Sequence, residues 1–133
     1  KLAIEIFQND IKRATLESIL HPRVIEEEKN IYFDCQKLDP QAIVIIDSAL
    51  LIESKNYKNV DKVIIIKSNE ELQIKRVMNR DNKSRAAVKK RIQSQMSLEK
   101  KMIYADYIID NTNNRDLLKM QVNKLYTTLK SFL

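Results

Sequence analysis

Glycine is absent from this 133-residue chain. An average composition of about 7% would supply roughly nine glycines. The two common phosphate-binding loops need glycine where the backbone approaches the phosphates closely, so neither the P-loop nor the dinucleotide-binding loop occurs in this chain. The first residue is Lys1 rather than methionine, and we expect a fragment or a processed piece of a longer protein.

Cysteine and long apolar runs are also scarce. Cys35 is the single cysteine, which excludes an internal disulfide and a multi-cysteine zinc site and fits a reducing compartment. The longest apolar run, residues 42–46, has five residues, whereas a membrane-spanning helix needs about 20. No signal-peptide pattern stands at the start. We therefore expect a cytoplasmic location, no membrane partner and one domain with a hydrophobic core.

Positive charge is concentrated in one stretch, residues 75–101, called the basic segment below. The net charge is +6 overall. The basic segment has ten lysines and arginines against two acidic residues, a net charge of +8, and the rest of the chain carries −2. Three interpretations stay open: a phosphate site, a nucleic-acid patch and a solvated helical face.

Hydrophobic periodicity predicts several helices. Asp10 is a candidate N-cap for a helix to about Leu20. His21-Pro22 predicts a break, because the residue before proline avoids the helical region, and Pro22 suits the first turn of a second helix. Asp39-Pro40 predicts a turn. Later helices are expected after Ser68 or Asn69, after Ser84, after Ser97 and after Asn111.

Three short β-branched runs predict strands: residues 42–47, 63–66 and 106–110. Continuous apolar strands are typical of parallel sheets, which are buried on both faces. Helices alternating with such strands predict the later part of an open α/β sheet. Three strands alone would leave two bare hydrophobic edges, so further strands are expected on the N-terminal side.

Basic residues at helical spacing form the first candidate site. Arg76 and Arg80 are four apart and share a helical face, so two guanidinium groups can converge on one phosphate. Lys83 and Arg85 follow in a polar turn. Such an edge suits a mobile lid that closes over phosphates. The alternative is a surface face that makes salt bridges.

Other polar residues have a plain and a functional interpretation. Asp47 ends a predicted strand, where an acid can hold magnesium or serve as a cap or turn residue. His21 is the only histidine and is expected to be a structural hydrogen-bonding residue rather than a catalyst. Asp106 and Asp110 bracket the last strand as candidate strand-end caps, and Cys35 is expected to be inert.

Five segments in order resemble the dephospho-CoA kinase family, from about residue 1 to residue 125. They are Leu16–Pro22, Ile45–Glu53, Gln73–Asp81, Ile92–Met96 followed by Lys100 or Lys101, and Ala105–Asn111. Each segment alone is a weak signal, and the ordered set is specific. The chain departs from the family in lacking its P-loop and catalytic aspartate, in Ala49 where proline is usual, and in Asn113-Asn114 where glycine is common.

The resemblance implies an α/β fold: a three-layer α/β/α, P-loop nucleoside-kinase-like domain with a parallel sheet, whose P-loop strands are not in this chain. It would be one partial kinase domain. Its parts would be a helical substrate-binding part (1–41), core strands and a helix (42–74), a basic lid (75–101), and the last strand with a C-terminal helix (102–133).

The resemblance also implies a reaction, the transfer of the γ-phosphoryl group of ATP to the ribose 3′-hydroxyl of dephospho-CoA with Mg²⁺. Arg76 and Arg80 would clamp the phosphates as catalytic residues. The remaining implied sites are His21, Pro22, Leu50, Leu51 and Glu53 for dephospho-CoA, Asn111, Lys83 and Arg85 for the nucleotide, and Asp47 for magnesium through water. Without the P-loop, the chain alone is expected to be inactive.

Two alternatives come from other classes of protein. A basic helical nucleic-acid-binding module would use the basic segment, but only Tyr104 and Tyr107 lie near it for base stacking. A non-catalytic interaction domain is the other alternative. A P-loop encoded upstream of Lys1 would favour the kinase, whose partners are small molecules and not nucleic acid.

Overall fold

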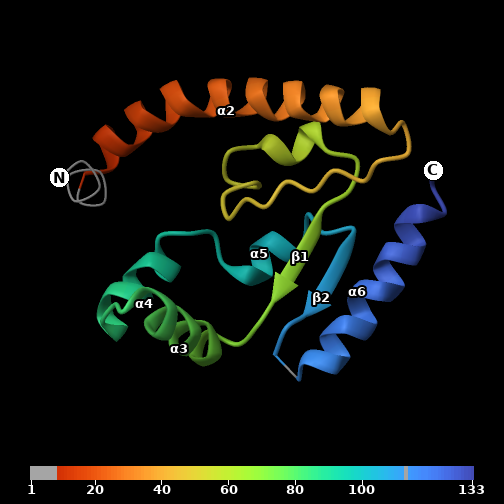
Figure 1. The fold of residues 1–133 in the computed structure, drawn as a ribbon. Coiled ribbons are helices and arrows are strands. Elements are labelled where there is room, and N and C mark those ends of the chain that lie inside the picture. Colours follow the sequence, from red (N-terminus) through yellow and green to blue (C-terminus); the bar gives the residue numbers. More distant parts are fainter. Residues whose placement is uncertain (1–8, 113) are drawn as a thin grey trace. The chain divides into compact units, whose positions relative to one another are not determined.

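The computed structural model describes residues 9–112 and 114–133 and comprises two compact units, residues 1–47 and 48–133 (Figure 1). Among the described residues, the first unit contains one long helix, and the second contains a small parallel sheet with four α-helices and one short 3₁₀ helix.

Helix α2 (Asp10–Leu38) begins at an asparagine cap. The side-chain oxygen of Asn9 accepts hydrogen bonds from the N–H groups of Ile11 and Lys12, both at 3.0 Å. The expected cap at Asp10 is therefore wrong by one residue. None of the helices in the described part of the chain is both long and apolar enough to cross a membrane.

Pro22 does not end a helix, so the predicted break at His21-Pro22 and the second helix from Pro22 are wrong. Both residues lie inside α2. An interior proline removes one backbone hydrogen bond, here to the carbonyl four residues earlier, and the helical bonds on both sides remain. The predicted turn is confirmed: α2 ends at Leu38, and Asp39 takes the extended conformation that a residue before proline prefers.

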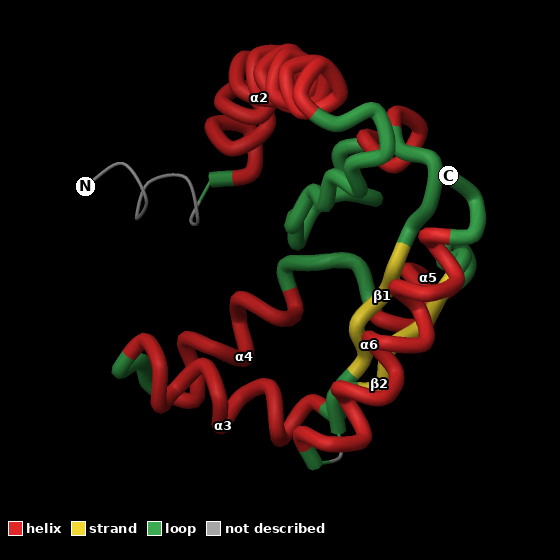
Figure 2. The backbone as a smooth tube through the Cα atoms, turned by 45° about the vertical axis from the view of Figure 1, so that its right-hand side comes forward, coloured by secondary structure: helices red, strands yellow, loops and turns green. Residues whose placement is uncertain are grey.

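Residues 42–47 do not form the predicted strand. They belong to the loop after α2, which Figure 2 shows in green. A strand requires a neighbour for its N–H and C=O groups, and the sheet in the described residues consists of two other strands. The β-branched run therefore has no partner here.

The other two predicted strands are confirmed. Strands β1 (Ile64–Lys67) and β2 (Tyr107–Asp110) pair in parallel, with Ile64 opposite Tyr107 and Lys67 opposite Asp110. The protein is thus of the α/β class with a parallel sheet. Both strands end at the same edge of the sheet, which becomes important for the site.

The predicted helices of the second unit are also confirmed. They are α3 (Glu70–Asp81), α4 (Arg85–Gln93), α5 (Leu98–Met102) and α6 (Arg115–Lys130), and a short 3₁₀ helix η1 (Asn56–Asn59) precedes β1. Asn69 and Ser84 cap α3 and α4 with their side chains. Helix α3 packs against α4, α5 against β1, and α6 against β2 (Figure 1).

Two residues adopt the left-handed backbone conformation that glycine usually adopts. Asn82 ends α3 with φ of 49°, and Lys55 has φ of 63° before η1. Asparagine tolerates the left-handed region because its short side chain bonds locally, whereas the left-handed region costs about 1–2 kcal/mol for most L-residues. The turn between α3 and α4 is therefore built without glycine.

The hydrophobic core lies in the second unit. Its buried side chains come from the loop before η1, from the residue just before β1, from β2, and from α3 and α4: Ile52, Val63, Ile109, Ile74 and Val88. Ile74 is the most deeply placed, with 1% of its surface exposed. None of the side chains described in the first unit is buried to this degree.

Aspartates bracket β2 as expected and fix both of its ends. At the start, an Asp106 carboxylate oxygen accepts the N–H of Val63 at 2.7 Å. At the end, Asp110 accepts the N–H of Thr112 at 2.8 Å and pairs with Lys67 at 3.1 Å. Hydrogen bonds from Thr112 and the charge of Lys67 lower the pKa of Asp110 from 3.8 to about 2.

We expect Ile74→Ala to lower the free energy of unfolding by about 2–5 kcal/mol, because it removes a fully buried side chain and leaves a cavity. Urea unfolding measures the change. The matched control is Ile103→Ala, whose side chain is 81% exposed and should cost about 0.5 kcal/mol or less. Equal losses in both variants would contradict this location of the core.

The lowered pKa of Asp110 predicts a pH dependence of stability. A carboxyl with a depressed pKa stabilises the folded state fully above its unfolded-state value and loses that contribution as the pH falls from about 4 to about 2. Asp110→Asn should therefore flatten the fall in unfolding free energy across this window. Urea unfolding at several pH values tests this, with Asp61→Asn, an exposed aspartate, as the control. The same slope in Asp110→Asn and wild type would rule it out.

Candidate functional site

The carboxyl edge of the β1–β2 sheet brings two loop segments together. Ser68 and Asn69 follow β1, and Asn111 and Thr112 follow β2. The N–H of Asn111 donates to the carbonyl of Lys67 at 2.8 Å, which extends the pairing past the last residue of β2. Open α/β sheets bind ligands at this edge. Asn111, predicted from the resemblance to bind the nucleotide, thus lies where the fold class places ligands.

Arg76 reaches this edge from α3. Its Nη1 atom donates to the backbone carbonyl of Asn111 at 3.0 Å. The structure therefore brings together two predicted site residues that are 35 positions apart. A guanidinium group has five N–H donors, so the contact uses only part of the group's donor capacity.

Arg80 lies one turn further along α3 and contacts a different group. Its Nε and Nη2 atoms donate to the two carboxylate oxygens of Asp81 at 2.6 and 3.1 Å. This hydrogen-bonded pair lowers the pKa of Asp81 and raises the pKa of Arg80. Arg91 of α4 lies 3.8 Å from the same carboxylate. The two predicted clamp arginines thus share a helix but each has its own protein partner.

Arg85 and Lys83, predicted to bind the nucleotide, lie at the α3–α4 turn. Arg85 begins α4 and makes two hydrogen bonds to the carboxylate of Glu71 in the first turn of α3, one of them 2.9 Å long. The pair lowers the pKa of Glu71 and raises that of Arg85. Lys83 is exposed in the turn. Arg80 and Arg85 thus form the surface ion pairs that were the alternative to a lid.

A pocket of about 590 Å³ lies along α3 at this turn. It is lined by residues of α3, its cap Asn69, the Arg85 side of α4 and Thr112 after β2. The pocket therefore borders the carboxyl edge of the sheet on one side. Arg76 and Arg80 are not among its lining residues.

Glu53, predicted to bind dephospho-CoA, is held by a later part of the chain. Its Oε1 atom accepts the N–H of Met96 at 2.9 Å and lies 3.0 Å from the ammonium of Lys101. Lys101 also donates to the carbonyl of Ala49 at 2.8 Å. Burial raises the pKa of Glu53, but the hydrogen bonds from Lys101 and Met96 outweigh it and hold the pKa below its usual value. The motif left Lys100 or Lys101 open, and of these two it is Lys101 that contacts Glu53 and Ala49.

Leu50 and Leu51 lie in a tight turn within this segment. The carbonyl of Leu50 accepts the N–H of Ser54 at 2.9 Å, and that of Leu51 accepts the N–H of Tyr57 at 3.1 Å. Both leucines are half-buried. Their backbone is therefore fixed by hydrogen bonds that run forward into η1.

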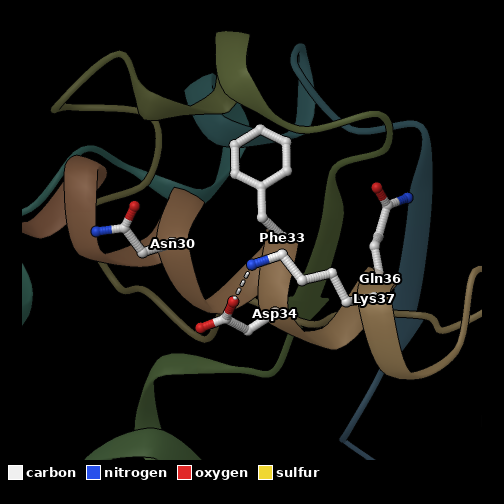
Figure 3. A pocket seen from close by; sticks show the side chains of 5 residues that line it. All are labelled: Asn30, Phe33, Asp34, Gln36 and Lys37. Carbon is white, nitrogen blue, oxygen red and sulfur yellow. Dashed lines mark hydrogen bonds and ion pairs between the residues drawn. The ribbon is translucent and has the colours of Figure 1, made fainter.

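His21, Pro22 and Asp47 belong to the first unit. His21 is half-buried within α2, Pro22 is exposed in the same helix, and Asp47 is exposed at the end of the unit. A pocket on the C-terminal half of α2 is lined by Asn30, Phe33, Asp34, Gln36 and Lys37, with Lys37 and Asp34 paired at 2.8 Å (Figure 3). This pocket contains none of the predicted site residues.

Metal binding was predicted at Asp47 alone. In the part of the chain that the structure describes, no group of three or more His, Cys, Asp or Glu side chains can hold a metal ion. A kinase magnesium ion takes one or two carboxylates together with water and substrate phosphates. A single exposed aspartate suits contact through water, the role that the resemblance implies.

Two glutamines that sequence reasoning missed hold the edge of the sheet. Gln73 donates from Nε2 to the carbonyl of Ser68 at 2.8 Å. Gln121 of α6 accepts the N–H of Asp110 at 2.9 Å and donates to its carbonyl at 3.0 Å. Gln73 belongs to one of the five motif segments, which is a usable signal. No sequence signal identifies Gln121, because a polar residue on a helix is expected to face solvent.

Comparison with known proteins agrees with the motifs. The family model for dephospho-CoA kinase matches residues 1–116. The dephospho-CoA kinase of Fusobacterium nucleatum is 33% identical over 129 residues, which cover 97% of this chain and 65% of that protein. That of Bacillus cereus is 42% identical over 114 residues, covering 84% of this chain and 55% of that protein.

A solved structure is similar over nearly the whole chain. It is the dephospho-CoA kinase from Campylobacter jejuni, with a TM-score of 0.59 and 34% identity, covering 99% of this chain and 65% of that one. The neighbour carries the P-loop kinase fold, in agreement with the parallel sheet described above. The chain spans 55–65% of the length of these three proteins. With the motif segments, the fold and the family match in agreement, the chain belongs to the dephospho-CoA kinase family.

Proposed function

We propose that the protein, in its natural length, transfers the γ-phosphoryl group of ATP to the ribose 3′-hydroxyl of dephospho-CoA, the last step of coenzyme A biosynthesis. The observation that carries the proposal is the Arg76–Asn111 hydrogen bond at the carboxyl edge of the sheet. It joins the motif segment of the phosphate clamp to the motif segment of the nucleotide site. Membership of the family supports the same reaction.

The two ligands occupy different parts of the chain in this proposal. ATP lies at the sheet edge, with Asn111 near the adenine and Lys83 and Arg85 toward the phosphates. Dephospho-CoA is bound by His21, Pro22, Leu50, Leu51 and Glu53. Asp47 would hold Mg²⁺ through water, and the ion would supply positive charge that neutralises the ATP phosphates.

Arg76 and Arg80 neutralise charge during the transfer. Phosphoryl transfer is mostly positioning and electrostatic stabilisation, so guanidinium groups near the phosphates act on the transition state. Arg76 can keep its bond to Asn111 and still offer other N–H groups to a phosphate. Arg80 has to exchange Asp81 for the phosphate. The Arg80 side chain is 71% exposed, so its guanidinium group is open to solvent and the more highly charged phosphate can replace Asp81 as its partner.

The chain needs a phosphate-binding loop from outside its 133 residues to perform this reaction. It contains no glycine, so the backbone amides that cradle the β- and γ-phosphates are not in it. We therefore propose that the 133 residues alone are inactive. A cytoplasmic location, with small-molecule ligands and no nucleic acid, belongs to the same proposal.

The protein in its natural length should convert dephospho-CoA to a 3′-phosphorylated product with ATP and Mg²⁺. Product analysis by mass spectrometry with a coupled ADP assay measures this. Folded full-length protein that forms no such product would refute the proposed reaction.

The control for that experiment is the purified 133-residue chain under the same conditions. It should show no turnover above background, because nothing in it positions the β- and γ-phosphates. Turnover by this chain, in a preparation free of other kinases, would show that the missing glycine loop is not required.

Arg76→Ala and Arg80→Ala should each lower kcat more than they raise the KM for dephospho-CoA. A clamp that engages as charge develops acts on the transition state, and loss of a clamping arginine costs up to about 10³–10⁵ in rate in related chemistry. With two arginines sharing the charge, we expect about 10³ or less. Arg→Lys should restore activity only in part, because lysine cannot make a bidentate contact. Steady-state kinetics with both substrates varied measures the split.

The matched controls are Lys89→Ala and Lys90→Ala, which remove the same charge from the exposed face of α4. They should leave kcat within about twofold of wild type, or roughly 0.5 kcal/mol. If the arginine variants also stay within that range, the clamp is wrong and the surface-charge interpretation holds.

A further inference from the structure

The Lys101 ammonium contacts two points of one short segment. It lies 3.0 Å from Oε1 of Glu53 and donates to the carbonyl of Ala49 at 2.8 Å. We propose that Lys101 is a positioning residue for the acceptor substrate: it fixes residues 49–53 in the conformation that binds dephospho-CoA. The identity of the acceptor rests on the function proposed above.

The Glu53–Lys101 pair differs from the other ion pairs near the candidate site in its burial. Lys101 is 15% exposed and Glu53 is 23% exposed, whereas the cations of the other pairs, Lys67, Arg80 and Arg85, are 42%, 71% and 54% exposed. A pair removed from water is screened little and holds its geometry. Lys101 is therefore a fixed support rather than a solvated surface charge.

The Glu53 carboxylate depends on this support. Its Oε1 atom accepts a hydrogen bond from the N–H of Met96 and pairs with the ammonium of Lys101. Its Oε2 atom is buried without a hydrogen-bond partner in the described part of the chain. Removal of the ammonium would leave a largely buried carboxylate with only backbone N–H donors, from Met96 and from Glu53 itself, among the described residues. A buried charge without its partner is strongly unfavourable. The segment would then have to rearrange to bring Glu53 to water.

Such a rearrangement would move the predicted acceptor residues. Leu50 and Leu51 lie between the two residues that Lys101 contacts, Ala49 and Glu53. A shift of either contact point therefore moves the backbone of both leucines. The turn that contains them is closed by the Ser54 N–H and the Leu50 carbonyl. A displacement of about 1 Å in a substrate-positioning segment can cost roughly 10²-fold in catalysis. Lys101 thus acts on the acceptor through these leucines.

Helix α5, which carries Lys101, has a second contact with the same region. The ring of Tyr104, just after α5, meets the ring of Tyr57 edge-on with centroids 4.9 Å apart. The helix also packs against β1. It therefore connects the acceptor segment to the sheet whose edge is the proposed nucleotide site.

Lys101→Met in the natural-length protein tests the inference, because methionine keeps the length of the side chain and removes the charge and the donors. We expect the KM for dephospho-CoA to rise about tenfold or more, with the KM for ATP within about twofold of wild type. Lys101→Arg should restore most of the acceptor KM. Lys100→Met, the exposed neighbour, is the matched control and should match wild type.

Amide hydrogen exchange provides a readout that needs no activity. The N–H of Met96 donates to Glu53 and that of Ser54 closes the turn, so both should exchange at least about tenfold faster in Lys101→Met than in Lys100→Met. If wild type does not phosphorylate dephospho-CoA, the proposed function fails and exchange alone decides whether Lys101 holds the segment.

Three results would overturn the inference. They are an unchanged acceptor KM in a folded Lys101→Met variant, an equal rise in the KM for both substrates, and unchanged exchange at Met96 and Ser54. If Lys101→Met does not fold, Lys101→Gln replaces it under the same criteria, since glutamine is uncharged but can still donate to a carbonyl.

Discussion

The parallel pairing of β1 with β2 determines where the groups at the sheet edge lie. The register sets Lys67 opposite Asp110, so the two strands end together and their following segments leave the sheet side by side. The Asn111 N–H then reaches the Lys67 carbonyl, and the Asn111 carbonyl meets Arg76. A slip of one residue would reverse the faces of every side chain in a strand and break both bonds.

Local signals in the sequence were sufficient for most of the second unit. β-branched runs predicted β1 and β2, and Asn69 and Ser84 cap the helices that they were expected to cap. The predictions were wrong where the structure depends on residues outside the local sequence pattern. Residues 42–47 have strand composition, but a strand exists only with a partner. Pro22 lacks the backbone N–H that a helix needs, but α2 continues on both sides of it.

The roles of the predicted site residues stay predictions, and the pairings of these residues could not be predicted from the sequence. Helical spacing correctly placed Arg76 and Arg80 on one helix, but it cannot say that one contacts Asn111 and the other Asp81. The motif position of Glu53 suggested a contact with a ligand, but the sequence does not show that its carboxylate pairs with Met96 and Lys101. Such contacts join positions tens of residues apart, and no periodicity encodes them.

The ion pairs of the second unit separate into two kinds that suit two tasks. In the pairs Arg80–Asp81 and Arg85–Glu71 the arginine is 71% and 54% exposed, so its guanidinium group faces solvent and the pair is screened and exchangeable. The Glu53–Lys101 pair is largely buried, where losing one partner strands the other, so it holds its geometry. The two kinds of pair therefore differ in what they can do: the exposed arginines can change partners, whereas the segment that Lys101 holds around Glu53 stays in place.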